Sequence, residues 1–483
     1  MGRALLTSEW TPGRLRPRSG VPVALALLLL GSGCAGEGEG PGGAASSGAT
    51  PPELDAPPNV VLISLDTLRP DHMGTYGYER DTTPFLDELA AQALVFEHAR
   101  TTWTWTLIAH MSMLTGLYPA QHQVWSETAS LAEGTWTLAA RLAEVGYETW
   151  GFYHTPAWLE PSFGFEQGFD RYVPHHSVDE AMGHIEEALV EKREEDPLFL
   201  FLHLFDIHNA PFTEVGPLYM PPREYADRFA LGAWDAACAN ELDRPKNKQR
   251  IWESADIPVS AEQRDAIEAL YDACILHVDD RLRELFASLE RRGLMENTLV
   301  IVTSDHGEGL AERWKKFGGH GGAFEEGMRV PLIVQLPQAI RRAERISDPV
   351  SHTDIAPTVL DLCGIPRDER LRGASLVREL PDERPFFAQH EDRRVVYRLP
   401  WKVMELQKGR PSIYNLESDP GEVRRGLTPK EKRQRTYLAG RILEWADEET
   451  AGWFTPGAAI VQELDADHAA NMQALGYGGG ADD

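Results

Sequence analysis

Short apolar runs alternate with helix-like segments from Asn59 onwards. Four runs are almost continuously apolar and rich in β-branched or aromatic side chains, over residues 59–65, 198–205, 298–303 and 330–336. Such runs are typical of strands buried on both faces of a sheet. Between them lie segments with helical patterns, over 84–96, 137–146, 177–195 and 261–293. This alternation predicts an α/β fold, in which helices cover both faces of a mostly parallel sheet.

The N-terminal segment has the pattern of an export signal. Four arginines precede the apolar run 21–30, which is too short to span a bilayer. The run LGSGC (30–34) resembles a bacterial lipobox, at which Cys34 would be lipidated and become the mature N-terminus. Ordinary signal cleavage nearby is the alternative. We expect residues 1–33 to be a signal peptide, 34–58 a flexible linker rich in Gly, Pro, Ser and Ala, and the protein to be exported to the periplasm or cell surface on a lipid anchor.

The composition excludes several classes of partner. The chain has 47 Lys and Arg against 75 Asp and Glu, so its formal charge is −28. Such a surface repels phosphate backbones, and we therefore expect no nucleic-acid partner. Anionic lipid surfaces are equally unattractive, so membrane contact should come only through the anchor at Cys34. With only four cysteines, the chain is not a disulfide scaffold.

Three of the predicted strands run into acidic residues. The first ends at Asp66, the second runs into Asp206 and His208, and the third is followed by Asp305 and His306. An Asp after a strand is commonly a turn former or helix cap. In parallel sheets, however, ligands collect at the carboxyl ends of strands, where these side chains would converge. We therefore predict a site for a divalent cation, Ca, Mn, Mg or Zn.

The segment 101–119 supplies a candidate nucleophile. Its strand-like Thr and Trp residues give way to a helix-like apolar run near Thr106. A Thr at this point would cap the helix and place its hydroxyl at the positive end of the helix dipole, with His110 one turn along the same face. A metal-bound hydroxyl placed there can ionise and attack an electrophile. A simple helix cap with a core-facing His is the structural alternative.

Seven strings in the chain resemble the sulfatase family of the alkaline phosphatase superfamily. They are NVVLISLDTLRPDHMGTYGY (59–78), MLTGLYP (113–119), GFEQGFDRY (164–172), FDIHNAPF (205–212), TLVIVTSDHGEGL (298–310), GHGGAFEEGMRVPLIV (319–334) and IYNLESDPGE (413–422). The resemblance implies an alkaline-phosphatase-like central mixed sheet between helices and a small C-terminal α+β subdomain. We expect a catalytic domain over 59–367, the subdomain over 368–425, and a C-terminal helix and tail over 426–483, with the helix over 427–447. The resemblance also implies Asp66, Asp305 and His306 as metal ligands.

The departures from the family pattern concern the nucleophile. Family members carry Cys-x-Pro-Ser-Arg or Ser-x-Pro-Ser-Arg, whose first residue is oxidised to formylglycine. Here Thr106 stands first and His110 last, and Thr cannot become formylglycine. We take both Thr106 and His110 as candidate catalytic residues. The chain therefore resembles Thr-nucleophile branches of the superfamily, in which Thr106 would also bind the metal. His208 and His320 occupy places where relatives bind the anion or protonate the leaving group.

Three functions are compatible with this pattern. The first is a metal-dependent hydrolase or transferase that cleaves phosphate mono- or diesters of a small molecule, glycan or lipid through Thr106. The second is a sulfuric ester hydrolase of the arylsulfatase type, and the third is a catalytically inactive binding protein. We expect one metal ion, with a second site built from Asp206, His208 and His320 as the alternative.

Overall fold

The computed structural model describes a large part of the chain beyond the predicted signal and linker. The described residues are 54–126, 128–155, 157–209, 217–229, 232, 260–312, 322–381, 384–390, 393–406, 409–423, 428–450 and 461–463. All belong to the second of two units, Ser47–Asp483. The predicted signal peptide, Cys34, most of the linker, Cys238 and His320 lie outside the described residues.

An eight-stranded sheet forms the centre of the fold, with the strand order β5-β4-β6-β1-β7-β8-β2-β9. The strands are β1 (Asn59–Leu65), β2 (Leu94–Arg100), β4 (Glu148–His154), β5 (Arg171–His175), β6 (Leu198–Leu204), β7 (Thr298–Thr303), β8 (Leu332–Gln335) and β9 (Glu344–Ser351). Within this sheet β8 runs antiparallel to both neighbours, and the other pairs are parallel. The predicted mixed, mostly parallel sheet is confirmed.

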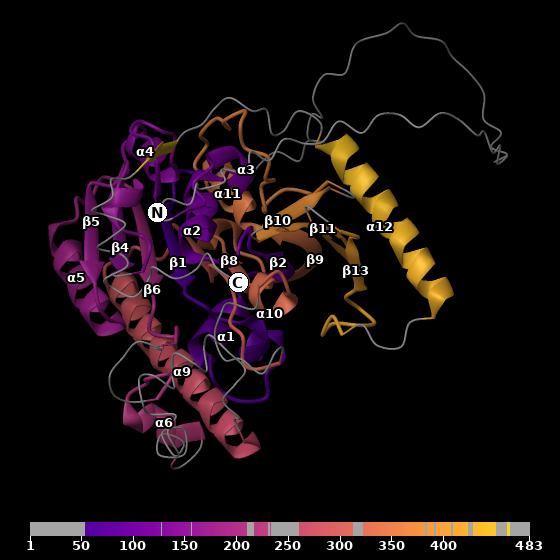
Figure 1. Cartoon of the computed structure of the whole chain (residues 1–483). Coiled ribbons are helices and arrows are strands. Elements are labelled where there is room, and N and C mark those ends of the chain that lie inside the picture. Colours follow the sequence, from indigo (N-terminus) through magenta and orange to yellow (C-terminus); the bar gives the residue numbers. More distant parts are fainter. Residues whose placement is uncertain are drawn as a thin grey trace, which may run out of the picture. The chain divides into compact units, whose positions relative to one another are not determined.

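Helices cover both faces of the sheet, as Figure 1 shows. One face packs against α1 (Pro84–Ala90), α5 (Val178–Glu191) and α9 (Ala261–Arg291). The other packs against α2 (Thr106–Thr115), α4 (Leu138–Ala143) and α11 (Ile355–Leu362). Strand β1 contributes alternate residues to the two layers, because successive side chains of a strand point to opposite faces. The layer with α9 receives Val61, Ile63 and Leu65, whereas the layer with α2 receives Val60 and Leu62.

A small antiparallel sheet follows the main sheet in the chain. Its strands, in hydrogen-bonding order, are β10 (Phe386–His390), β11 (Arg393–Arg398), β12 (Trp401–Leu406) and β13 (Ser412–Asn415). Helix α12 (Pro429–Glu449) packs on this sheet through Ala439, Ile442, Leu443 and Ala446. Thr428 and Glu431 form a capping box at its start, so the helix predicted over 427–447 is confirmed.

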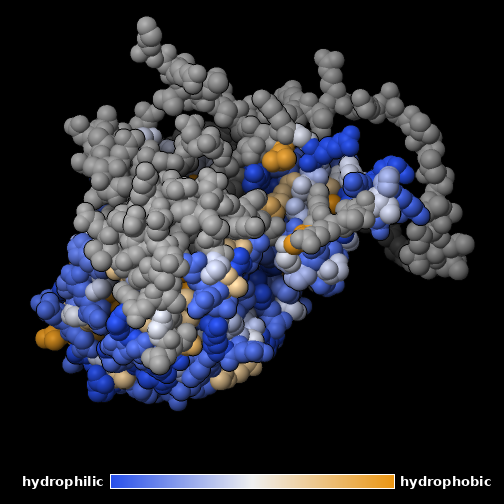
Figure 2. All heavy atoms as spheres, turned by 60° about the horizontal axis from the view of Figure 1, so that its bottom comes forward, coloured by the Kyte–Doolittle hydropathy of each residue, from blue (hydrophilic) through white to orange (hydrophobic). Residues whose placement is uncertain are grey.

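Shorter elements complete the fold. They are α3 (Pro119–His122), α6 (Arg223–Phe229), α10 (Glu325–Met328), the strands β3 (Ala129–Leu131) and β14 (Val461–Glu463), and the 3₁₀ turns η1 (Pro70–His72), η2 (Gly74–Tyr76), η3 (Pro161–Phe163), η4 (Gln338–Ile340) and η5 (His352–Asp354). Strands β3 and β14 form a two-stranded antiparallel sheet. The face drawn in Figure 2 is predominantly hydrophilic where residues are described, in keeping with the acidic composition.

Two local predictions are wrong. The helix predicted over 84–96 ends at Ala90, and Leu94–Arg100 form β2. Leu94, Val95 and Phe96 are all buried, because the strand pairs with β8 and β9 and packs on both faces. A run buried on all sides has no periodicity that separates strand from helix, so only the pairing decides. The residues 101–105, predicted to be strand-like, belong to no strand.

Candidate active site

Two neighbouring parallel strands bring three predicted metal ligands together. Strand β1 ends immediately before Asp66, and β7, which pairs with β1, is followed by Ser304, Asp305 and His306. One ligand atom from each of Asp66, Asp305 and His306 lies within 4.8 Å of the others, and all three residues are buried. We refer to these residues as the acidic cluster. Two of the three strand ends predicted to converge therefore do so, whereas Asp206 and His208, after β6, are not part of this group.

The acidic cluster has donor atoms suited to a divalent cation. Asp305 Oδ1 accepts hydrogen bonds from the backbone N–H groups of Thr67 (3.2 Å) and His306 (2.8 Å). In contrast, Asp66 Oδ1 and Asp305 Oδ2 are buried and have no hydrogen-bond partner among the described residues. His306 Nδ1–H donates to the Gly307 carbonyl (2.9 Å), so the neutral ring presents the Nε2 lone pair, 3.3 Å from Asp305 Oδ2. Two orphaned carboxylate oxygens and an oriented imidazole fit a cation of the predicted class.

The electrostatics of the acidic cluster also favour a cation. Burial raises the pKa of Asp66 well above its ordinary value, and the carboxylates of Asp305 and Glu308 raise it further. Burial likewise raises the pKa of Asp305. Burial of two carboxylates without a counter-charge disfavours their ionised forms, whereas a bound cation favours them.

Thr106 lies beside the acidic cluster. Its Oγ1 is 3.4 Å from Asp66 Oδ2 and 3.4 Å from His306 Nε2. The structure corrects one detail, because Trp105 occupies the cap position and Thr106 is the first residue of α2. The hydroxyl still lies at the positive end of the helix. It is therefore directed at the atoms that would surround a cation, rather than back at its own helix.

His110 lies one turn after Thr106, as predicted, but it does not contact the Thr106 hydroxyl. His110 Nδ1–H donates to the Thr106 carbonyl (2.9 Å), and Nε2 accepts from the Ser64 hydroxyl (2.8 Å). The ring is fully buried, and burial lowers the pKa of His110 to about 4. A neutral ring with both nitrogens hydrogen-bonded supports the first turn of α2 against β1.

The turn after Asp66 has a strained backbone. Thr67 has a φ of 60°, which is unusual for a β-branched residue. Its hydroxyl donates to the Asp66 carbonyl (2.7 Å). The Tyr271 hydroxyl on α9 donates to the Thr67 carbonyl (2.8 Å) and accepts from Arg69 N–H (3.0 Å). This contact holds the turn in the conformation that directs Thr67 N–H at Asp305.

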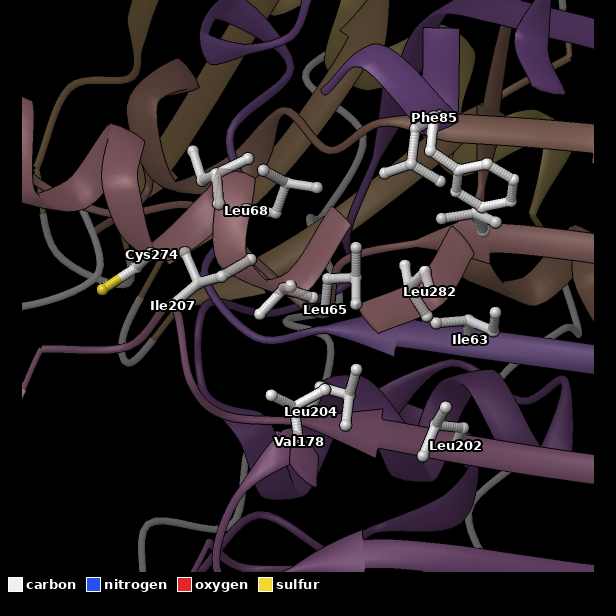
Figure 3. Packing of buried hydrophobic residues seen from close by; sticks show 14 of the residues in the cluster. Ile63, Leu65, Leu68, Phe85, Val178, Leu202, Leu204, Ile207, Cys274 and Leu282 are labelled. Carbon is white, nitrogen blue, oxygen red and sulfur yellow. The ribbon is translucent and has the colours of Figure 1, made fainter. Parts of the chain in front are cut away.

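Apolar neighbours anchor the same turn. Leu65 and Leu68 flank the polar residues and are buried in the cluster that also contains Ile207 and Cys274 (Figure 3). Moving the turn would expose these side chains, so the position of Asp66 is coupled to the packing between β1 and α9.

In the loop after β6, Asp206 and His208 contact residues outside the acidic cluster. Asp206 Oδ1 accepts from the backbone N–H of Val178 (3.0 Å), the first residue of α5, and burial raises the pKa of Asp206 to about 6. His208 Nδ1–H donates to the Asn209 carbonyl (2.6 Å), and its ring stacks on Phe205 with centroids 4.1 Å apart. Asn209 Nδ2 in turn donates to Glu308, which ties this loop to the loop carrying His306.

The sequence interpretation missed one residue of the site, His203 on β6. His203 Nε2 lies 3.1 Å from Asp66 Oδ2, and the ring is fully buried. Burial lowers the pKa of His203 well below its ordinary value, and His110 and His154 lower it further. The available signal was a lone imidazole inside the otherwise apolar run LFLFLHL, where a buried polar side chain requires a partner.

Comparison with known proteins agrees with this geometry. Residues 58–365 match the family model described as Sulfatase. The chain belongs to the sulfatase family. Residues 322–437 also match the model described as N-sulphoglucosamine sulphohydrolase, C-terminal. This sulfatase-family protein is accordingly an ester hydrolase, and members of the family bind a divalent metal.

Relatives cover most of the chain at low identity. An uncharacterized sulfatase of Escherichia coli, YidJ, is 26% identical over 66% of this chain and 70% of its own length. An arylsulfatase of Clostridium perfringens is 22% identical over 84% of this chain and 97% of its own. The multifunctional alkaline phosphatase superfamily protein PehA of Trinickia caryophylli is 26% identical, over 75% and 85%.

Solved structures share the fold. The phosphonate monoester hydrolase of Agrobacterium radiobacter superposes with a TM-score of 0.62 at 20% identity, covering 81% of this chain and 96% of its own. A protein solved with its substrate D-glucosamine-2-N,6-O-disulfate superposes with a TM-score of 0.63 at 18% identity, over 82% and 98%. Among the described residues of the present chain, no helix has the length and apolar character needed to cross a bilayer.

Proposed function

We propose that this protein cleaves phosphate mono- or diesters with Thr106 as the nucleophile and Asp66, Thr106, Asp305 and His306 around a single divalent cation. The observation that carries the proposal is the position of the Thr106 hydroxyl, 3.4 Å from both Asp66 Oδ2 and His306 Nε2 at the start of α2. A hydroxyl with only a capping role would face the N–H groups of its own helix.

A bound cation would supply two effects at this site, a lower pKa for the Thr106 hydroxyl and neutralisation of charge on the ester. Thr106 Oγ1 attacks phosphorus, and the bond to the leaving alcohol breaks as the new O–P bond forms. The alcohol takes a proton, for which His208 and His320 are the candidate donors. Water or a second alcohol then attacks phosphorus and gives up a proton, the Thr106 Oγ1–P bond breaks, and the released Thr106 oxygen takes up a proton to regain its hydroxyl.

The chemistry of Thr favours phosphorus over sulfur. A formylglycine hydrate releases sulfate by collapsing to the aldehyde, but a Thr sulfate ester must be broken by a second attack. Sulfuric ester hydrolysis is the second candidate, because relatives include the C. perfringens arylsulfatase and a Bacteroides thetaiotaomicron N-acetylglucosamine-6-O-sulfatase. These relatives also suggest a glycan as the alcohol part of the substrate, with small-molecule and lipid esters as the alternatives.

The decisive assay compares three substrates. The full-length protein, loaded in turn with Mn, Mg, Zn and Ca, is tested on bis-nitrophenyl phosphate, nitrophenyl phosphate and nitrophenyl sulfate. We expect phosphate ester cleavage that Thr106→Ala reduces at least about a thousandfold. Ser112→Ala is the matched control, since this buried hydroxyl on the same helix faces His122 instead. Dominant sulfate cleavage would reverse the ordering of the two functions, and full activity in Thr106→Ala would eliminate the nucleophile.

Two further parts of the proposal concern the rest of the molecule. A second cation held by Asp206, His208 and His320 is the alternative to a single ion, and metal analysis of the purified protein separates one equivalent from two.

We also propose that the protein is exported and anchored through a lipid on Cys34. Mass spectrometry of the mature N-terminus from a bacterial expression host tests this, and an unmodified terminus after residue 34 would contradict it.

A further inference from the structure

His203 makes a contact that its place in the fold does not require. It lies on β6, opposite Ser64 of β1 in the parallel register, where the neighbouring positions of β6 are apolar and fully buried. An apolar residue at this position would continue the pattern of the strand. Instead a buried imidazole directs Nε2 at Asp66 Oδ2 over 3.1 Å.

The hydrogen bond to Asp66 determines which ring nitrogen of His203 carries the hydrogen. Asp66 Oδ2 can only accept when its carboxylate binds a cation, so Nε2 must carry the hydrogen. The neutral ring then leaves Nδ1 as a bare lone pair, and Nδ1 has no hydrogen-bond partner among the described residues. An orphaned buried acceptor is costly, and it persists here because the other nitrogen serves the carboxylate.

The surroundings keep the ring in this orientation. The rings of His203 and His110 form an edge-to-face pair, with centroids 4.8 Å apart at an interplanar angle of 81°. His110 is itself fixed by the Thr106 carbonyl and Ser64. The His175 ring donates from Nε2 to the backbone carbonyl of His203 (2.9 Å). The ring of His203 therefore packs against His110, the backbone at His203 is held by His175, and Nε2 is directed at one carboxylate oxygen.

Because of this contact, the two carboxylate oxygens of Asp66 have different surroundings. Oδ2 receives His203 Nε2 and the Thr106 hydroxyl, whereas Oδ1 is free of protein partners among the described residues. We propose that His203 is a positioning residue, which holds Oδ2 so that Oδ1 is presented to the cation and Thr106 stays within reach. The proposal rests on the function proposed above. Removing such an outer hydrogen bond to a ligand typically weakens metal binding 10- to 100-fold.

The test measures Mn binding by calorimetry on the metal-free full chain, together with the melting temperature of each variant without metal. His203→Leu should raise the Kd for Mn by about 10- to 100-fold. His203→Gln retains an N–H donor at a similar distance from the backbone and should stay within about threefold of wild type. The matched control is His122→Leu, since this histidine is equally buried but bonds Ser112 and Val124, away from the acidic cluster.

The outcomes separate positioning from packing. The proposal is supported if His203→Leu binds Mn weakly and His203→Gln binds it nearly as well as wild type. His122→Leu should then be less stable than wild type but bind Mn normally. Unchanged Mn affinity in His203→Leu, or equally weak binding in His203→Gln, overturns it. If the folded wild type binds no Mn, Mg, Zn or Ca at all, the metal-dependent function itself fails, and the role of His203 fails with it.

Discussion

A buried ion network connects the small sheet to the main sheet, and Lys402 is its central member. Lys402 Nζ on β12 lies 2.9 Å from Glu325 Oε1, at the start of α10, and 2.9 Å from Glu422 Oε1. Glu325 also pairs with Arg100 at the end of β2, at 2.8 Å. The side chains of Lys402 and Glu422 are fully buried, so two cations balance two anions without help from solvent.

Replacing Lys402 by Met removes one charge and nearly preserves the volume. The network is then left with a net negative charge between Glu325 and Glu422. Breaking a buried pair by removing one partner costs about 3–5 kcal/mol, and we expect a loss of this size in the free energy of unfolding at pH 8. Glu422→Gln added to Lys402→Met removes the excess charge and should recover at least about 2 kcal/mol of that loss.

The loss should also depend on pH. Burial raises the pKa of Glu422, an effect that Lys402 partly offsets, so the variant should hold a proton on Glu422 more firmly than wild type. A raised carboxyl pKa gives stability that disappears as pH rises, and the deficit of Lys402→Met should therefore be smaller at pH 5.5 than at pH 8.

Urea denaturation followed by circular dichroism at the two pH values measures these quantities. A Lys402→Met variant within about 0.5 kcal/mol of wild type at pH 8 would show that the network is energetically neutral. A double variant no more stable than the single one would show that lost packing, and not unbalanced charge, causes the effect.

Three further predictions concern the site and its supports. Thr67→Gly should raise the free energy of unfolding by about 0.5–1 kcal/mol, because glycine adopts the φ of 60° without strain and this relief exceeds the loss of the Thr67 hydroxyl contact; a lower free energy of unfolding in urea would show that the hydroxyl contact outweighs the strain. Mn at a hundredfold excess over its Kd should stabilise the protein by about 2.7 kcal/mol, and thermal melts of Asp305→Asn should show no such shift. Asp279 accepts from the backbone N–H groups of Phe85 (2.7 Å) and Leu86 (2.9 Å) at the start of α1, and burial raises its pKa to about 7. Protons are therefore bound more tightly in the folded state between about pH 4 and 7, so wild type should lose stability relative to Asp279→Asn as pH rises from 5 to 7.5, by up to about 1.4 kcal/mol per pH unit; the opposite slope would show that the helix terminus dominates over burial.

The strands at the centre of the sheet could be predicted because their own residues favour a strand, without reference to their neighbours. Short continuous runs rich in β-branched residues, followed by polar residues, favour inner strands, and β1 and β7 match the predicted 59–65 and 298–303 in both bounds. Strand β2 was mistaken for the end of a helix because its apolar residues carry no periodicity, and its identity depends on pairing with β8 and β9.

For the site, too, some residues could be predicted from the sequence and others only from the structure. The sequence predicted that three strand ends with acidic residues converge, and the structure brings together two of them, with Asp66, Asp305 and His306. The change of pattern near Thr106 indicated the hydroxyl. The role of His203 depended on which strands are neighbours and in what register, since only the pairing of β6 with β1 sets His203 opposite Ser64 and beside Asp66. Residue type and order determine which side chains stand at the ends of strands. Contacts between strands that are far apart in the chain arise only from packing. Packing therefore decided that the lone polar side chain of β6, His203, has Asp66 as its partner.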